Sequence, residues 1–166
     1  MNYFDFFSLA KQFDINQNEL EIKYLAIQQA SHPDKLINKS AEERFTALNR
    51  SVEANNAYFT LKDHRARAKY LLSLDNINID QEIRHSIPKE LLQQSFIDRE
   101  TLEDSDNVED LNALLNKTKE AISLIQQDLI KDFNSKNSKN AIIQTIKLQY
   151  KTKLLLEIKT KIKKIR

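Results

Sequence analysis

The chain has 166 residues, of which 40% are hydrophobic and 30% charged, so it can form one domain of ordinary size or two small ones. It contains no cysteine, which excludes disulfides, thiol catalysis and thiolate metal sites. It also has no glycine and only two prolines, and sheets need the turns made by these residues more often than helical hairpins do. The composition therefore predicts an all-α fold.

The net charge of +2 is unevenly distributed along the chain. Residues 1–75 carry ten basic and ten acidic side chains, residues 76–135 carry 6 basic and 13 acidic ones, and residues 136–166 carry 10 basic and 1 acidic one. This asymmetry indicates either a basic tail for an acidic partner or two segments that neutralise each other within one bundle. No apolar run approaches the ~18 residues of a membrane span, and the start lacks the basic region of a signal peptide. We expect a cytosolic protein.

The first helix is expected over Tyr3–Lys11, with phenylalanines to bury. Asn16, followed by Glu19 three residues later, is typical of a capped helix start. This second helix must end near His32, because a residue that precedes proline is pushed out of the α region. Its apolar residues recur at spacings of three and four, at Leu20, Tyr24, Ile27 and Ala30.

Ser40 and Glu43 form a second capping pair and predict the start of a third helix, and Asp63 can cap a fourth. The third helix lines up its apolar residues on one stripe, at Phe45, Leu48, Val52 and Phe59. The fourth carries Ala66, Tyr70, Leu71 and Leu74. These two helices complete the first half of the chain.

Residues 75–85, DNINIDQEIRH, have weak helical periodicity and several Asn and Asp residues, which indicates a linker. Pro88 fits the first turn of a new helix. A long helix is expected from about Val108 to Phe133, and the stretch NSKNSKN at 134–140 separates it from the last. The last helix carries apolar residues at nearly every fourth position, at Ile142, Ile146, Tyr150, Leu154, Ile158, Ile162 and Ile165.

The stretch QQASHPDKLINKS, residues 28–40, places His32, Pro33 and Asp34 at the tip of the first helical hairpin. Acid–base catalysis needs a second proton-transfer group and a nucleophile or substrate pocket, and no triad pattern or phosphate-binding glycine loop accompanies this triplet. His32, His64 and His85 are scattered, with no pair one helical turn apart. We therefore expect no enzyme, no cofactor and no metal site. The triplet is either a helix stop or a contact for another protein.

The order of elements around SHPDK (31–35) resembles the J domain of DnaJ-type co-chaperones. With NYFDFFSL at the start, NNAYFTLKDHRARAKYLLSL at 55–74 and three helices behind, the whole chain is similar to the HscB family, the J-proteins of iron–sulfur cluster assembly. The resemblance implies a J domain at 1–75, built from a helical hairpin and two short helices. A linker at 76–86 and a scaffold-binding three-helix bundle of the oligomerisation type at 87–166 follow, in an L-shaped arrangement of two lobes.

In this family the triplet docks on HscA, a specialised chaperone of the heat shock protein 70 family, and stimulates its ATPase. The resemblance implies that Pro33 fixes the loop and leaves Asp34 free for a bidentate bond to a partner arginine, while His32 orients that carboxylate or donates its own hydrogen bond. Lys23 and Lys35 complete the implied chaperone site. The chain departs from the family at Ser31, where a tyrosine is usual, and in a less basic helix before it.

The family also binds its scaffold protein IscU through the second lobe, and the matching stretch is LLQQSFIDRETLED (91–104). The implied scaffold site consists of Leu92, Phe96, Glu100 and Asp104, which recur every four residues and so share one helix face, together with Tyr150. Gln93 and Ile97 stand where the family more often has an apolar and an acidic residue. The alternative is that the apolar members of this set are core residues of the bundle.

The leading interpretation is a non-enzymatic adaptor that presents the scaffold to the chaperone, in a bacterial cytosol because the N-terminal cysteine pair of the eukaryotic form is absent. Two alternatives are a J-domain protein for other clients and a helical binding module for an acidic partner. The basic tail, KTKLLLEIKTKIKKIR, also fits a nucleic-acid or membrane surface. Its lysines can instead lie beside the acidic residues of 98–132, and we expect neither nucleic acid nor membrane as a partner.

Overall fold

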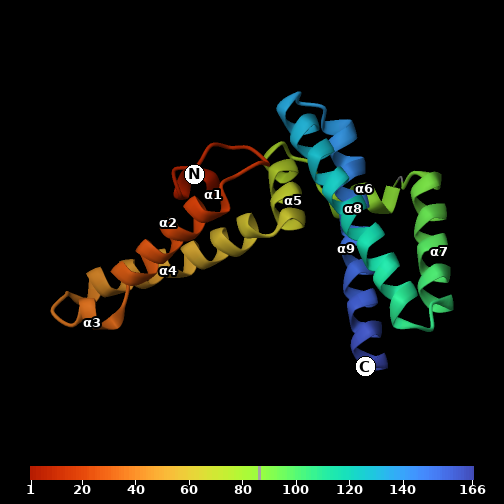
Figure 1. Cartoon of the computed structure of the whole chain (residues 1–166). Coiled ribbons are helices and arrows are strands. Elements are labelled where there is room, and N and C mark those ends of the chain that lie inside the picture. The colour runs from red at the N-terminus through yellow and green to blue at the C-terminus, as the bar shows by residue number, and fades with distance from the viewer. Residues whose placement is uncertain (86) are drawn as a thin grey trace. The chain divides into compact units, whose positions relative to one another are not determined.

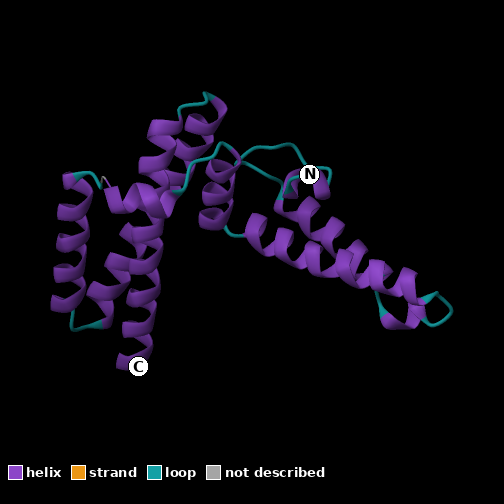
Figure 2. Ribbon diagram, turned by 180° about the vertical axis from the view of Figure 1, so that it is seen from behind, coloured by secondary structure: helices purple, strands orange, loops and turns teal. Residues whose placement is uncertain are grey.

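The computed structural model describes residues 1–85 and 87–166, and within them it contains helices and loops but no strand (Figures 1 and 2). The predicted all-α fold is confirmed. The helices are α1 (Tyr3–Phe6), α2 (Gln17–Ala30), α3 (Pro33–Leu36), α4 (Ala41–Lys62), α5 (His64–Leu74), α6 (Ile79–His85), α7 (Lys89–Asp104), α8 (Val108–Asn134) and α9 (Ser138–Ile165).

Side-chain caps set most of the predicted helix starts. The side chain of Asn16 accepts a hydrogen bond from the backbone N–H of Glu19, and Ser40 and Glu43 form a reciprocal capping box at the start of α4. The carboxylate of Asp63 accepts from the N–H of Ala66 in the first turn of α5. Each bond satisfies a backbone donor that has no partner within its helix.

Two of the predicted segments differ from the structure. The first helix is shorter than Tyr3–Lys11, because Ser8 adopts a left-handed conformation with φ 51° and the N–H of Leu9 closes the helix end on the carbonyl of Phe4. The segment 76–86, expected to be a linker, contains α6, whose first residue Ile79 is fully buried. Pro88 lies at the N-cap of α7, one position before the first turn.

Among the described residues, three helices end through a left-handed residue although the chain has no glycine. Ser8, Asn76 and Lys136 have φ of 51°, 60° and 56°, and they follow α1, α5 and α8. In each case the next backbone N–H donates to a carbonyl five residues back, as from Asn137 to Asp132 at 2.8 Å. This is the Schellman pattern, which satisfies helix-end carbonyls and usually employs glycine.

The chain divides into two compact units, residues Met1–Leu71 and Leu72–Arg166, and each is described by itself. In the first unit α2 and α4 lie side by side and antiparallel, with α3 at the far end of the hairpin (Figure 1). Tyr24 of α2 stacks on Tyr58 of α4 with ring centroids 4.0 Å apart, and its hydroxyl donates to Asn55. The buried residues of this unit lie at the opposite end of the hairpin from α3, and they include Phe4, Phe7, Phe13, Leu20, Ala54, Ala57 and Leu61.

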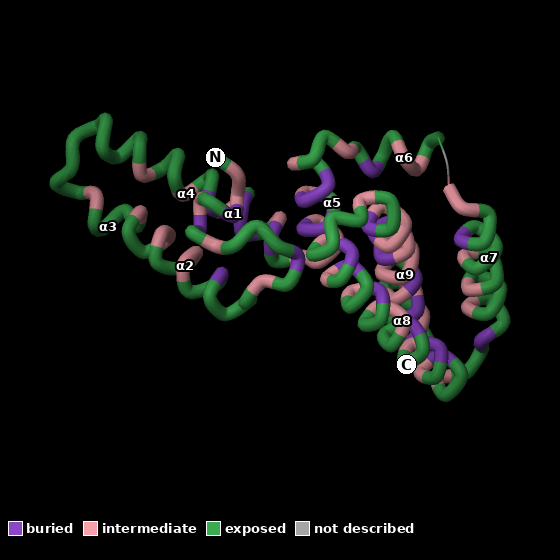
Figure 3. Tube along the Cα trace, turned by 90° about the horizontal axis from the view of Figure 1, so that it is seen from above, coloured by how far each residue is buried: buried purple, intermediate pink, exposed green. Residues whose placement is uncertain are grey.

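The predicted apolar stripe of α4 lies on one face, but that face is exposed. Phe45, Leu48, Val52 and Phe59 are between 50% and 65% exposed. The core of the unit is formed by the opposite face of the helix, where Ala54, Ala57 and Leu61 are fully buried, and α1 and α2 contact α4. Figure 3 shows that the α3 end of the hairpin is largely exposed.

In the second unit the long helices α8 and α9 pair along most of their length (Figure 1). Their apolar faces form a core cluster of Leu111, Leu114, Leu154, Ile158 and Ile162, against which Leu102 of α7 packs. Of the α7 side chains only Leu91 is buried. No helix among the described residues is long and apolar enough to cross a membrane.

Candidate functional site

The tip of the first hairpin contains a short helix, where the sequence predicted only a loop. Pro33 occupies the first position of α3, where its missing N–H costs nothing, and His32 is the N-cap with extended backbone. The backbone N–H of Asp34 donates to Nδ1 of His32 at 3.2 Å. The imidazole therefore caps the helix and fixes the turn that presents the aspartate.

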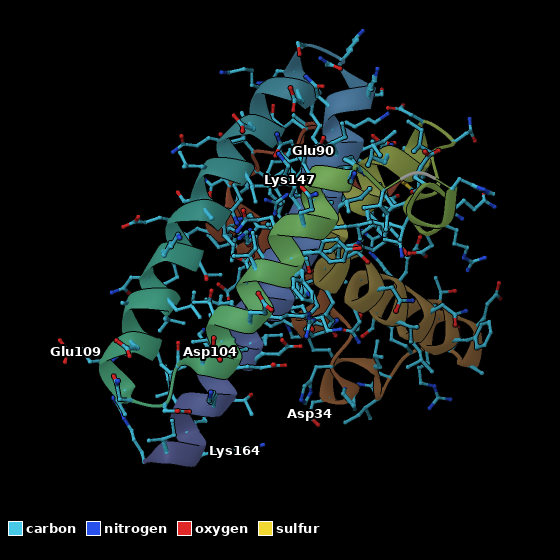
Figure 4. The ribbon with its side chains drawn as sticks, turned by 90° about the vertical axis from the view of Figure 1, so that its right-hand side faces the viewer. Asp34, Glu90, Asp104, Glu109, Lys147 and Lys164 are labelled. Carbon is cyan, nitrogen blue, oxygen red and sulfur yellow. The ribbon has the colours of Figure 1, made fainter. Side chains whose placement is uncertain are left out.

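The carboxylate of Asp34 is available to a partner. Its side chain is 84% exposed, and its Oδ2 lies 3.6 Å from Nδ1 of His32. Since that nitrogen accepts the backbone N–H, a neutral imidazole carries its proton on Nε2 and has no donor to offer the carboxylate at Nδ1. The carboxylate consequently keeps its lone pairs for an outside donor, and Lys35 beside it is also exposed. Figure 4 labels the Asp34 side chain on α3.

Lys23, the other basic residue of the implied chaperone site, is engaged inside its own unit. Its ammonium group lies 2.6 Å from the carboxylate of Glu19 and 3.0 Å from the backbone carbonyl of Ser8. Two of its three donors thus tie α2 to the turn that follows α1. Ser31 is half-buried at the C-cap of α2.

The α7 residues implied for scaffold binding are exposed and do not contribute to the core. Leu92 is 48% and Phe96 63% exposed, and Glu100 and Asp104 are exposed on the same helix. Ile97, which the sequence analysis did not include in the site, is 52% exposed next to Phe96 and extends the apolar surface. The only sequence signal for it was a departure from the family pattern.

Tyr150 occupies a different environment from Leu92 and Phe96. It is half-buried and lines a cavity of about 280 Å³ between α7, α8 and α9. Leu91 and Ser95 of α7 and Ile125 of α8 also line this cavity. Figure 4 shows two charged residues of its lining, Glu90 near the start of α7 and Lys147 on α9. Tyr150 is therefore half-enclosed beneath α7, whereas the α7 residues face outward.

Polar contacts join α7 to α9, and the sequence analysis did not identify them individually. Lys151 forms an ion pair with Asp98 at 2.5 Å, and Arg99 forms one with Glu157 at 3.3 Å. Lys161 donates to the backbone carbonyls of Leu102 and Glu103 at 2.7 and 3.0 Å. The predicted neutralisation of the acidic segment by the basic tail is thus confirmed at Lys151, and the opposite charges of the two segments were the signal for it.

Comparison with known proteins agrees with this geometry. The family model of the HSCB C-terminal oligomerisation domain matches residues 87–159. The co-chaperone protein HscB homolog of Shewanella oneidensis is 32% identical over 165 residues, which cover 95% of each chain. The solved chaperone HscB from Vibrio cholerae is 29% identical, with a TM-score of 0.86 over 100% of both chains. The human co-chaperone HscB shares the fold, with a TM-score of 0.90 over 99% of this chain and 83% of its own, at 22% identity.

A helical hairpin with an exposed His-Pro-Asp turn, followed by a helical unit, defines a J-domain co-chaperone. Such a protein acts on a chaperone of the heat shock protein 70 family and is not itself an enzyme. The chain belongs to the HscB family of these co-chaperones, as its sequence resemblance implied, and it functions in iron–sulfur cluster assembly.

Proposed function

We propose that this protein stimulates the ATPase of HscA and delivers the iron–sulfur scaffold IscU to it, in the cytosol of a bacterium. The observation that carries the proposal is the exposed Asp34 carboxylate on a turn fixed by Pro33 and by the side chain of His32. Because the turn is already fixed before binding, little further conformational freedom of the backbone is lost when a partner binds. The carboxylate is therefore preorganised for an arginine fork.

At the chaperone end each residue of the triplet has a separate task. Asp34 accepts a bidentate bond from a partner arginine. His32 caps α3 through Nδ1 and leaves its Nε2–H to donate to the partner. Pro33 restricts the backbone at the first helical position, and Lys35 adds positive charge to the same exposed turn.

At the scaffold end the proposed contact is the outer face of α7. Exposed Leu92 and Phe96 supply apolar anchors, Glu100 and Asp104 supply acidic neighbours, and Tyr150 supports this face from the cavity beneath α7. Binding energy in protein interfaces concentrates in a few large apolar side chains surrounded by polar ones. The arrangement fits a partner surface with apolar groups flanked by basic ones.

The test is ATP turnover by HscA, measured with this protein and with IscU, alone and together. We expect the protein to accelerate turnover and IscU to increase the acceleration. Asp34→Asn should abolish the stimulation while changing the free energy of unfolding by less than about 0.5 kcal/mol, as exposed substitutions usually do. Asp106→Asn, the same chemical change at an exposed residue of the second unit, is the matched control and should retain full stimulation.

Other outcomes would replace the proposal. Stimulation that is unaffected by IscU would indicate a J-domain protein for other clients. Full stimulation by a folded Asp34→Asn variant would exclude the docking role of the triplet and leave it as a helix stop.

A further inference from the structure

A groove of about 690 Å³ lies between the C-terminal half of α7 and the last turns of α9. Leu102 and Glu103 line it from α7, and Leu156, Thr160 and Lys164 are among the residues that line it from α9. Leu156 is 53% exposed, although it lies in a bundle whose other leucines on this helix are buried or half-buried. The groove thus has an open apolar side chain within it.

Two charged residues of the groove have their partners inside the unit. Glu157 pairs with Arg99, and Lys161 donates to the carbonyls at the end of α7. Lys153 and Lys164, which also line the groove, form no ion pair with another residue of the described ranges. These two ammonium groups are available to an outside anion.

The two walls of the groove carry opposite charge. The α7 wall carries Glu103 in the groove, with Glu100 and Asp104 exposed on the same helix, and the α9 wall carries Lys153 and Lys164. Figure 4 shows Asp104 near the end of α7 and Lys164 on the last turns of α9. The exposed α7 face that begins at Leu92 and Phe96 ends beside this groove.

We propose that the groove is a continuation of the scaffold-binding face and recognises the charge pattern of the scaffold. It takes a segment of the scaffold that places an apolar side chain against Leu156, basic residues against α7, and acidic residues against Lys153 and Lys164. This inference rests on the proposed function, since it assigns the charge pattern of the same partner. Opposite charges aligned across an interface select partners, because a like charge at either wall costs free energy.

The experiment is binding of purified IscU of the same organism to the full-length protein by isothermal titration calorimetry at low and moderate salt. The test variant is Lys153→Glu with Lys164→Glu. We expect its affinity to fall at least tenfold, and the salt dependence of binding to decrease because fewer unlike charges are paired across the interface.

The matched control is Lys159→Glu with Lys163→Glu. Both of these lysines are exposed on α9 outside the groove, and the net charge change is the same. Lys163 and Lys164 also both lie in the last turn, where a cation favours the helix dipole, so the control carries the same cost to the helix end. We expect the control to bind IscU within about twofold of the wild-type affinity.

Equal binding by the test and control variants would overturn the inference. Leu92→Ala separates this failure from that of the proposed function. If Leu92→Ala binds IscU more weakly and the lysine double variant does not, the scaffold site on α7 is retained and the groove is rejected. If the wild-type protein does not bind IscU, both proposals are rejected. If the double variant fails to fold, Leu156→Gln decides, because its exposed site tolerates a polar side chain. Retained affinity in Leu156→Gln would then reject the groove.

Discussion

Arg67 is a buried charge that joins several segments of the first unit. It is 2% exposed, its Nη1 donates to the backbone carbonyl of Leu61 at 2.7 Å, and its guanidinium lies 4.8 Å from the centre of the Phe13 ring. Burial lowers the pKa of Arg67 to about 10, opposed by the nearby carboxylates of Asp14 and Asp63. The guanidinium therefore stays charged at neutral pH, and the carbonyl of Leu61, the ring of Phe13 and the nearby carboxylates stabilise its positive charge.

His64 lies beside this arginine and predicts a pH dependence of stability. Burial lowers the pKa of His64 below its usual value of 6.5, the positive charge of Arg67 lowers it further, and Asp63 partly opposes both. The unfolded chain therefore binds the proton more readily than the folded one. The neutral His64 side chain therefore makes its full contribution to the free energy of unfolding above about pH 6.5, and this contribution decreases as the pH falls below that value.

We expect urea unfolding midpoints of the wild-type protein to decrease between pH 7 and pH 5, and His64→Gln to show a smaller decrease over the same range. The control is His85→Gln, whose histidine is exposed at the end of α6 and should keep the wild-type slope. Equal slopes for His64→Gln and the wild-type protein would show that His64 is not the titrating group.

The helices were easier to predict than the faces they bury. Caps such as Asn16 and Ser40 are local, because the cap and its partner lie three residues apart, so the sequence alone is sufficient to place them. The buried face of α4 depends on residues far along the chain. Its apolar stripe satisfies a helical period, yet the fully buried residues Ala54, Ala57 and Leu61 lie on the opposite face, where α1 and α2 contact α4.

The candidate site shows the same limit. The sequence could identify the His-Pro-Asp triplet by its resemblance to a family, but not the Nδ1 bond that makes His32 a cap. The role of Lys23 in chaperone binding stays a prediction. Its ion pair with Glu19 follows from their spacing of four residues on α2, whereas its hydrogen bond to the carbonyl of Ser8 joins α2 to the turn after α1. Distant contacts of this kind cannot be obtained from spacing along one helix.

The exposed face of α7 predicts a separation of binding from stability. Replacing Leu92 and Phe96 by alanine should weaken IscU binding at least tenfold, about 1.4 kcal/mol, because these side chains are the proposed anchors. Each change should alter the free energy of unfolding by less than about 0.5 kcal/mol, since both side chains are exposed. Core leucines cost ~2–5 kcal/mol on the same truncation.

Scaffold affinity by calorimetry and unfolding by urea, measured on the same samples, test this prediction. Leu129→Ala in the buried face of α8 is the control for a core position and should unfold much more easily. A comparable loss of stability in the α7 variants would mean that these residues pack in the protein and that the scaffold binds elsewhere.

At the scale of the whole molecule, the two compact units each contain their own buried residues. The first unit ends at Leu71, within α5, and its buried residues include Phe4 of α1, Leu20 of α2 and Leu61 of α4. The second unit is organised around the α8–α9 pair. The proposed chaperone and scaffold sites fall on different units, so we expect that cutting the chain between them separates the two activities.

A fragment of residues 1–75, which retains α5 in full, should fold alone and stimulate HscA without responding to IscU. Circular dichroism should show a helical spectrum and a cooperative melt, and ATP turnover should match the effect of the full protein measured without scaffold. A fragment that is unfolded in isolation would show that the first unit needs the second for its stability. If the folded fragment responds to IscU, then IscU binds the first unit, and the scaffold site proposed on α7 is wrong.

The division into two units also has a consequence for the encounter of the two proteins that are proposed to bind them. When the second unit holds the scaffold, the rate at which scaffold and chaperone meet no longer depends on the free concentration of the scaffold in the cell. The scaffold meets the chaperone at the effective concentration set by the covalent connection, which is on the order of millimolar for short tethers. A weak direct affinity between chaperone and scaffold is then sufficient for the two to bind each other while this protein holds both. The same weak affinity allows the scaffold to leave the chaperone after this protein has dissociated.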